Sequence, residues 1–231
     1  MSLPKIRDYK NVVFFTGAGM SAESGVPTYR GKGGIWKEYN YEEYACQQAF
    51  DTNPEKVWEF HNKRRMMVAK CDPNPGHQLI ANLEKELDNV TVVTQNIDGL
   101  HQAAGSENVF ELHGSLWKFR CDHEGILAES FDAPFTAIRR ETGTYWRPHI
   151  VWFGDMLFSD VVQGALDAIG QADLFVSIGT SGVVYPAAGF PVLAKQNGAT
   201  LVEINPQETA VSELFDHTLR GPATEMLPQL L

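Results

Sequence analysis

Cysteine is scarce in this sequence of 231 residues, which contains only three, and no two of them are close together. Such sparse usage excludes the disulfide framework of small secreted proteins and fits a reducing compartment. No stretch reaches the ~18 apolar residues of a membrane helix. Residues 1–15 also lack the apolar run and cleavage site of a secretory signal. We therefore expect a cytoplasmic protein that does not bind membranes.

Basic residues are outnumbered, with 19 Lys and Arg against 29 Asp and Glu, so the formal net charge is −10. Nucleic acids are bound through basic surfaces, and we therefore expect no direct contact with nucleic acid. An acidic surface attracts cationic partners, for example lysine-rich protein segments. The sequence also lacks internal repeats and low-complexity segments, and its 43% hydrophobic residues are typical of a globular protein.

Short apolar runs rich in β-branched and aromatic residues alternate with helical patterns along the chain. The predicted strands are Val12–Phe15, Val90–Thr94, Leu174–Ile178 and Thr200–Ile204. The predicted helices are His77–Leu87, Val161–Ile169 and Ala187–Gln196. Strands that are apolar throughout and alternate with helices favour a sheet covered on both faces. The sequence therefore predicts an α/β fold with a Rossmann-like, doubly wound parallel sheet.

Two aromatic-rich segments interrupt this alternation, and neither has the pattern of a βα repeat. They are residues 28–74, which we expect to be helical, and residues 116–148. We predict that these two insertions pack together into a small domain. Residues 1–27, 75–115 and 149–231 then form the Rossmann-like domain.

A glycine-rich turn follows the first predicted strand, where residues 17–22 have the pattern G-x-G-x-x-A before a helix. This arrangement suits a pyrophosphate, because glycines admit it closely and the helix offers free N–H groups. A tight turn without a ligand is the alternative. In hydride-transfer enzymes an acidic residue on a second strand follows about 20 positions later. Here that position lies in the first insertion, which argues against hydride transfer.

Small or amide-bearing residues follow three more predicted strands. They are Gln95–Asp98, Gly179–Ser181 and Asn205. Each could be an ordinary loop cap or Asx-turn when taken alone. Ligands of open α/β sheets bind at the carboxyl ends of the strands, so together these residues predict one continuous crevice.

Five segments, in this order, resemble the sirtuin family. Residues 17–31 read GAGMSAESGVPTYRG, similar to the family's GAGISAESGIPTFRG, and residues 94–101 read TQNIDGLH. Residues 111–114 read ELHG, residues 147–155 read RPHIVWFGD and residues 179–181 read GTS. The resemblance spans about residues 11–225 and is closest in pattern to the bacterial desuccinylase and deacetylase type.

The resemblance implies an enzyme of the acyltransferase class that removes acyl groups from protein lysines. NAD is the co-substrate, and the products are nicotinamide, free lysine and O-acyl-ADP-ribose. His113 would be the general base, acting on a ribose hydroxyl, and Asn96 the second catalytic residue. Imidazole titrates near neutral pH, which suits such a base. Acetyl is the expected acyl group, with succinyl and malonyl as further candidates.

Binding residues carry over from the same motifs. Those expected to contact NAD are Gly17, Ala18, Gly19, Ala22, Glu23, Tyr29, Arg30, Gln95, Asn96, Ile97, Asp98, Gly179, Thr180, Ser181, Asn205 and Ala223. Asp98 would recognise the nicotinamide carboxamide, and Asn205 would lie in the adenosine half. Those expected to pair with an acyl-lysine peptide, bound as an extended strand, are Val151, Trp152, Phe153 and Gly154. An ordinary buried strand is the alternative for residues 151–154.

The sequence departs from the family in its metal site and in the segment that contacts the acyl group. Only Cys121 and His123 stand where most sirtuins hold zinc with two cysteine pairs, so we expect no metal site and no structural zinc. His61 and Arg64 occupy the positions of a Tyr-x-x-Arg pair found in desuccinylating sirtuins, on one helix face. They could bind an acyl carboxylate, whereas a solvated basic helix is the alternative. Tyr29 replaces the usual phenylalanine.

Two other activities would use the same crevice. One is transfer of ADP-ribose to a protein side chain, which loss of zinc leaves open. The other is a non-catalytic module that senses NAD and recruits partners, in which His113 could be changed without consequence. The presence of Asn96, Asp98 and His113 favours deacylation over both.

Overall fold

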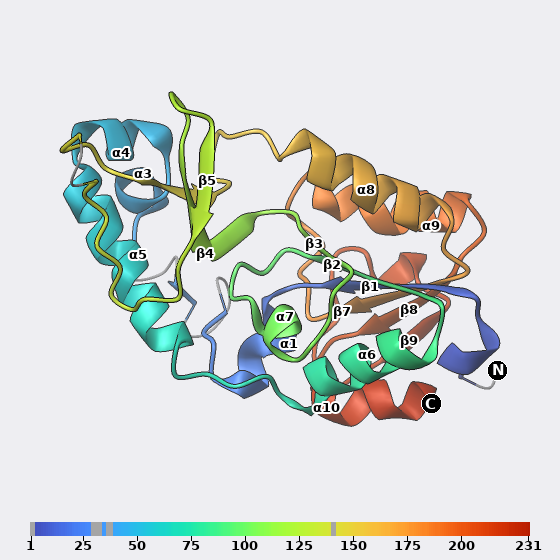
Figure 1. The fold of residues 1–231 in the computed structure, drawn as a ribbon. Coiled ribbons are helices and arrows are strands. Elements are labelled where there is room, and N and C mark those ends of the chain that lie inside the picture. The colour runs from blue at the N-terminus through green and yellow to red at the C-terminus, as the bar shows by residue number, and fades with distance from the viewer. Residues whose placement is uncertain (1–2, 29–33, 36–38, 140–141) are drawn as a thin grey trace.

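A parallel sheet of six strands dominates the structure, a computed structural model that describes residues 3–28, 34–35, 39–139 and 142–231 (Figure 1). The strand order is β3-β2-β1-β7-β8-β9. The strands are β1 (Asn11–Thr16), β2 (Asn89–Thr94), β3 (Val109–Glu111), β7 (Leu174–Ile178), β8 (Thr200–Ile204) and β9 (His217–Leu219). The predicted α/β fold is thus confirmed, and the four predicted strands form the centre of the sheet.

Helices cover both faces of this sheet, which explains why its central strands are mostly apolar. On β1, Val12 and Phe14 join the core on one face, and Val13 and Phe15 join the core on the other. The first face is covered by α6 (Pro75–Glu86) and α10 (Ala223–Met226), and the second by α8 (Ser159–Gly170) and α9 (Phe190–Gln196) (Figure 1). Asn74 caps α6 with its side chain, so this helix begins two residues before the predicted start.

Short helices complete the larger domain. They are η1 (Ile6–Asp8), α1 (Ala18–Ser21), η2 (Ala22–Ser24), α7 (Leu100–Ala103), η3 (Ala187–Gly189), η4 (Ser212–Leu214) and η5 (Leu227–Leu230). In the parts of the chain that the structure describes, no helix is both long and apolar enough to cross a membrane.

A second, smaller domain contains an antiparallel sheet with the order β5-β4-β6. Its strands are β4 (Gly114–Cys121), β5 (Ile126–Glu129) and β6 (Arg147–Ile150), and its helices are α3 (Tyr41–Tyr44), α4 (Gln47–Thr52) and α5 (Pro54–Val68). Aromatic packing joins the two insertions, since Trp58 of α5 lies in one cluster with Phe119 of β4 and Ala137. The sheet in the second insertion was not predicted, because its sequence lacks a regular apolar alternation.

The strand order fixes where a ligand can bind. After β1 the chain builds β2 and β3 on one side, and it later returns to place β7 on the other side of β1. This reversal opens a crevice at the carboxyl ends of β1 and β7, the position at which doubly wound sheets bind ligands.

Candidate active site

The glycine-rich turn after β1 packs directly against the loop after β7. Gly17 N–H donates to the carbonyl of Ile178 and Gly19 N–H to that of Gly179, both at 2.9 Å. A Cβ on Gly179, whose φ is +62°, would lie 2.5 Å from Gly19 Cα. The glycines therefore allow the two loops to pack closely, in addition to any approach of a phosphate. The sequence pattern alone did not distinguish these two roles.

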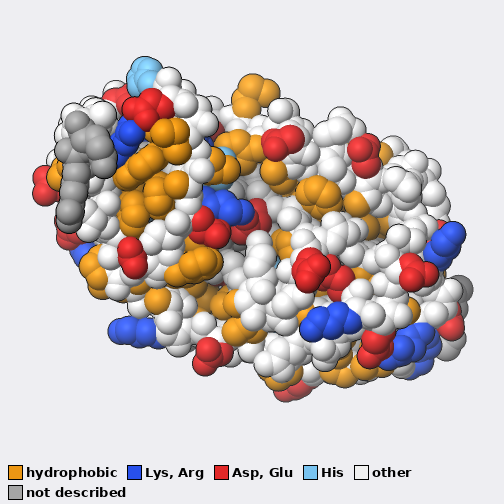
Figure 2. Space-filling view, viewed as in Figure 1, with side chains coloured by type: hydrophobic (Ala, Val, Ile, Leu, Met, Phe, Trp, Pro, Cys, Tyr) orange, Lys and Arg blue, Asp and Glu red, His pale blue; other side chains and the backbone are white. Residues whose placement is uncertain are grey.

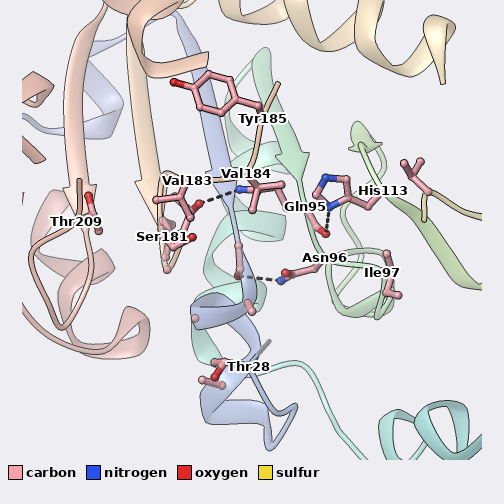
Figure 3. A pocket seen from close by; sticks show the side chains of 18 of the residues that line it. Thr28, Gln95, Asn96, Ile97, His113, Ser181, Val183, Val184, Tyr185 and Thr209 are labelled. Atoms are coloured by element: carbon pink, nitrogen blue, oxygen red, sulfur yellow. Dashed lines mark hydrogen bonds between the residues drawn. The ribbon is translucent and has the colours of Figure 1, made fainter. Parts of the chain in front are cut away.

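Asn96 is held rigidly just beyond the end of β2. Its side-chain amide donates to the carbonyl of Gly17 at 3.0 Å (Figure 3). It also donates to Ser21 Oγ at 3.2 Å. Its backbone N–H donates to Thr94 Oγ1 at 3.0 Å. Because the amide nitrogen is used by the protein, the side-chain oxygen is the group that Asn96 can offer to a ligand.

Asp98 lies two residues further on and is also buried. Burial raises the pKa of its carboxyl, although a hydrogen bond from Leu100 N–H at 3.0 Å opposes this shift. Asp98 lines a small side pocket that Asn96 and Arg64 share with it. A carboxyl group in such a pocket can recognise the amide of a small ring compound.

Two buried histidines support this region, and sequence reasoning did not assign either of them to the site. His101 Nε2 lies 3.0 Å from Thr16 Oγ1, and His77 Nε2 lies 3.4 Å from Ser21 Oγ. Their rings are 4.8 Å apart. Burial lowers the pKa of His101 well below 6.5 and that of His77 to about 4, so both rings are neutral at pH 7. The two histidines link Thr16, at the end of β1, to Ser21, whose hydroxyl accepts a hydrogen bond from Asn96.

His113 occupies the turn between β3 and β4 and points into the main cavity (Figure 3). Its Nδ1 lies 2.9 Å from the carbonyl of Gln95, so Nδ1 carries the proton and donates it there. Nε2 is then the basic nitrogen. Burial lowers the pKa of His113 below 6.5, although the Gln95 hydrogen bond opposes this shift. At neutral pH the ring is therefore an uncharged base.

His61 and Arg64 lie on one face of α5, and both line the cavity. The His61 ring is stacked on Trp152 with centroids 6.0 Å apart, and it meets the Phe60 ring edge-on at 5.2 Å. Neither ring nitrogen has a hydrogen-bond partner among the described residues. Burial, with Arg64 and Arg147 nearby, lowers the pKa of His61 well below 6.5. A neutral imidazole and a guanidinium thus face the cavity together.

The predicted peptide-binding segment, residues 151–154, follows β6 as a loop and a turn rather than as a strand. Val151 N–H donates to the carbonyl of His113 and Phe153 N–H to that of Ala45, both at 3.0 Å. Trp152 N–H donates to the Asp155 carboxylate at 3.1 Å. The Trp152 carbonyl accepts from Asp155 N–H at 3.0 Å, so this segment is held in place by its own hydrogen bonds.

The crevice at the strand ends is one cavity of about 1430 Å³. Twenty of the residues predicted as site residues line it: Gly17, Ala18, Gly19, Ala22, Glu23, His61, Arg64, Gln95, Asn96, Ile97, His113, Val151, Trp152, Phe153, Gly154, Gly179, Thr180, Ser181, Asn205 and Ala223. Asp98 lines the adjoining side pocket. Tyr29 and Arg30 lie outside the described residues.

The cavity has further walls that sequence reasoning missed. Two segments line the cavity: residues 183–186, which follow the Gly179–Ser181 loop after β7, and residues 206–210, which follow β8 (Figure 3). Thr180 joins the loop after β7 to the ends of β8 and β2, since its carbonyl accepts a hydrogen bond from the Asn205 side chain at 2.8 Å and its hydroxyl one from Gln95 at 2.9 Å. The sequence shows that both segments follow predicted parallel strands. It does not show how far each segment extends into the cavity.

This sheet, its crevice and the glycine-rich turn define an α/β nucleotide-binding protein. Residues 17–186 match the model of the Sir2 family. The NAD-dependent protein deacylase of Aquifex aeolicus (strain VF5) is 44% identical over 223 residues, which cover 95% of this chain and 93% of that protein. The chain belongs to the Sir2 family.

Solved structures agree with this assignment. A Sir2 homologue in complex with NAD superposes with a TM-score of 0.90 at 44% identity, covering 98% of this chain and 90% of the homologue. A Sir2 variant with a deacetylated p53 peptide and 3′-O-acetyl ADP-ribose superposes with a TM-score of 0.85 at 30% identity, covering 97% and 93%.

Proposed function

We propose that this protein is an NAD-dependent protein deacylase that removes acyl groups from lysines and transfers them to ADP-ribose. The observation that carries the proposal is a single cavity in which the basic nitrogen of His113, the Asn96 oxygen and the strand-end loops converge. The cavity, about 1430 Å³, has room for a dinucleotide together with a lysine side chain. The relatives named as deacylases support the same reaction.

His113 is proposed as the general base. Its carbonyl partner Gln95 fixes the tautomer, so Nε2 can accept the proton of a ribose hydroxyl that then attacks the acyl carbon. Asn96 is proposed to orient the reacting part of NAD through its side-chain oxygen. Asp98, in the side pocket, is proposed to recognise the carboxamide of nicotinamide.

The other NAD contacts are proposed from their place along the cavity. The turn from Gly17 to Glu23 would hold the phosphates, since Gly17, Ala18 and Gly19 line the cavity and glycines admit a phosphate closely. The loops at Gly179–Ser181, Asn205 and Ala223 would hold the adenosine half. Glu23 also fixes this end, because its carboxylate accepts hydrogen bonds from Thr224 N–H at 3.0 Å and Thr224 Oγ1 at 2.6 Å.

Acyl-lysine segments of proteins are the proposed second substrate. A peptide would lie along residues 151–154 as an extended strand and place its lysine toward His113. We propose a cytoplasmic location, because cysteines are few, and no binding to membranes, because no stretch reaches ~18 apolar residues. We propose no direct binding to nucleic acid, because the net charge is −10. The face drawn in Figure 2 is consistent with this, since its Lys and Arg side chains are separated by acidic and neutral ones.

Acidic acyl groups, such as succinyl, are proposed as substrates beside acetyl. His61 and Arg64 line the cavity from α5, one neutral and one cationic, and His61 has hydrogen-bonding nitrogens without a described partner. A carboxylate on the acyl chain would accept hydrogen bonds from both. This pairing favours acyl recognition over a merely solvated basic helix, because both side chains are buried.

The acyl preference can be tested by replacing Arg64 with methionine. We expect kcat/KM for a succinyl-lysine peptide to fall roughly 10–100-fold, the cost of one charge-assisted hydrogen bond, and acetyl-lysine turnover to fall much less. Lys63→Met is the matched control, because Lys63 neighbours Arg64 but is exposed and pairs with Glu59. Equal losses on the two peptides would contradict acidic-acyl recognition.

The small domain is proposed to hold no structural zinc. Cys121 Sγ accepts a hydrogen bond from the Arg139 guanidinium at 3.1 Å, and Arg139 forms an ion pair with Glu124 at 2.7 Å. A guanidinium beside the thiol disfavours a divalent cation there, and one Cys with His123 supplies too few ligands. We expect purified protein to contain no stoichiometric zinc by elemental analysis and to keep its melting temperature in EDTA.

The division of the chain is proposed as predicted, with residues 28–74 and 116–148 in the small domain and residues 1–27, 75–115 and 149–231 in the Rossmann-like domain. The aromatic cluster that joins α5 to β4 supports it. Limited proteolysis that cuts first near residues 28 and 72, outside helices and strands, would agree with the first insertion. The boundaries at 116 and 149 lie within β4 and β6, which are paired in the small sheet.

The proposed reaction is tested by mass spectrometry of acetyl- and succinyl-lysine peptides incubated with NAD. We expect deacylation by the wild type and its loss in His113→Ala, with the exposed His123→Ala as the control that retains activity. ADP-ribose added to a protein without deacylation would favour ADP-ribosyl transfer. Binding of NAD without its consumption would favour a sensing module.

A further inference from the structure

Glu203 is a carboxylate that the proposed reaction does not use, although it is only 2% exposed. It lies on β8 between Ser177 of β7 and Thr218 of β9. One carboxylate oxygen accepts a hydrogen bond from Thr209 Oγ1 at 2.6 Å. The other accepts from Ser212 Oγ and from the Arg220 guanidinium, each at 2.6 Å. Three donors thus converge on one buried side chain.

All three donors belong to the segments that follow β8 and β9. Ser212 Oγ also accepts from Thr209 N–H at 2.8 Å, and Arg220 donates to the carbonyl of Gln207 at 3.2 Å. These bonds tie the loop of residues 205–211 to the sheet at several points. Glu203 thereby anchors the far end of the loop at Thr209 and Ser212, while residues 206–208 are exposed.

The inner side of this loop is a wall of the cavity. Residues 205–210 all line it, beside the Gly179–Ser181 loop. Val211 packs against Gly182, where an added Cβ would lie 2.5 Å from Val211 Cγ2, so no larger residue fits between the two loops. Asn205 completes the connection with its bond to the Thr180 carbonyl. The position of one wall therefore depends on the Glu203 cluster.

We propose that Glu203 is a positioning residue for the adenosine half of NAD, acting through Thr209, Ser212 and Arg220 without touching the ligand. This rests on the proposed function, which places the adenosine against these loops. A loop held before binding loses less conformational entropy when the ligand arrives, so the ligand binds more tightly. The carboxylate thus contributes to NAD affinity and not to the chemical step.

A carboxylate suits this place because the Arg220 guanidinium can only donate and carries a positive charge. Glutamine has nearly the same shape, but it offers one acceptor oxygen instead of two and no charge to pair with Arg220. Glu203→Gln therefore loosens the loop and also leaves Arg220 without its counter-ion. The substitution alters neither a cavity-lining residue nor a proposed catalytic one.

The test compares NAD and peptide kinetics of the wild type, Glu203→Gln and Glu84→Gln. For Glu203→Gln we expect KM for NAD to rise roughly tenfold and kcat at saturating NAD to stay nearly unchanged. A tenfold change is the cost of ordering one or two side chains when the ligand binds. KM for the acyl peptide should stay the same. Glu84→Gln is the matched control, because Glu84 also fixes a loop by accepting two hydrogen bonds, from the N–H groups of Glu107 and Asn108, but none of these residues lines the cavity.

Calorimetric titration with ADP-ribose separates this inference from the proposed reaction. A roughly tenfold weaker Kd in Glu203→Gln supports the positioning role even if no acyl peptide is turned over. An unchanged Kd for ADP-ribose overturns it. A loss of kcat at unchanged KM for NAD also overturns it, since that pattern reports a smaller folded fraction. Thr209→Val, which removes one donor, should shift the Kd in the same direction by less.

Discussion

At the scale of single residues, the burial of His113 determines the pH range over which the proposed general base is uncharged. Burial lowers the pKa of His113 below its ordinary value of 6.5, so the neutral base persists to lower pH than an exposed histidine would allow. The base is lost as pH falls through this lowered pKa. We predict that the acid limb of kcat/KM has its midpoint below pH 6.5, measured with an acetyl-lysine peptide at subsaturating concentration.

A matched variant tests the assignment of this limb. Gln95→Ala keeps the backbone carbonyl that holds His113 but removes the side chain that binds Thr180, so the midpoint should stay while KM for NAD rises. If the midpoint lies at or above pH 6.5, or moves in Gln95→Ala, a different group controls the limb.

At this scale the sequence predicted the residues that line the site, but not the residues that hold them in place. His113, Asn96 and Asp98 stand in contiguous motifs, and the motifs predict their place at the strand ends. His77 and His101 are 24 positions apart in the numbering and meet only because α6 and α7 pack side by side. A lone histidine on an amphipathic helix gives no local signal of such a partner, so this network required the fold.

At the scale of elements, Arg65 joins α5 to the small sheet. Its guanidinium donates to the carbonyls of Leu116, Ser130 and Asp132, and it lies between the rings of Trp117 at 5.0 Å and Phe135 at 5.2 Å. The planar fork of arginine can reach three carbonyls at once, which a lysine ammonium on a flexible stem cannot reproduce.

We predict that Arg65→Lys lowers the free energy of unfolding by roughly 1–3 kcal/mol, because at least one buried carbonyl loses its donor. Urea denaturation followed by tryptophan fluorescence measures this change. Lys63→Met on the exposed face of the same helix should leave the stability within about 0.5 kcal/mol of the wild type. An Arg65→Lys variant as stable as that control would show that aromatic packing alone holds the domain together.

Among the elements, the sequence predicted best the strands whose side chains are most completely buried. The four central strands are apolar on both faces, so each was found to within a residue. The edge strands β3 and β9 have three residues each and mixed polarity, which leaves no periodic signal. The small sheet was missed for a similar reason, since on β5 the side chains of residues 126–129 are largely exposed.

At the scale of the whole molecule, histidines are buried as neutral rings in both domains. Burial lowers the pKa of His61, His77, His101, His113 and His149, and the pKa values of His77 and His149 fall to about 4. In the unfolded chain each of them would titrate near 6.5. Between these two pKa values the unfolded state binds more protons than the folded state, so acid favours unfolding.

This difference predicts how stability depends on pH. Above about pH 7.5 the histidine contribution is constant, and as pH falls from there toward 4 the free energy of unfolding should decrease, with His77 alone accounting for roughly 2 kcal/mol by pH 5. Urea denaturation at pH 7.5, 6.0 and 5.0 measures the slope.

The exposed His123 supplies the control, since His123→Ala should keep the slope of the wild type. The variant His101→Asn, which replaces one buried ring by an amide that does not titrate, should have a shallower slope even if it is less stable at every pH. A slope equal to that of the wild type would mean that His101 does not titrate on unfolding, and the neutral network behind Asn96 would then need another explanation.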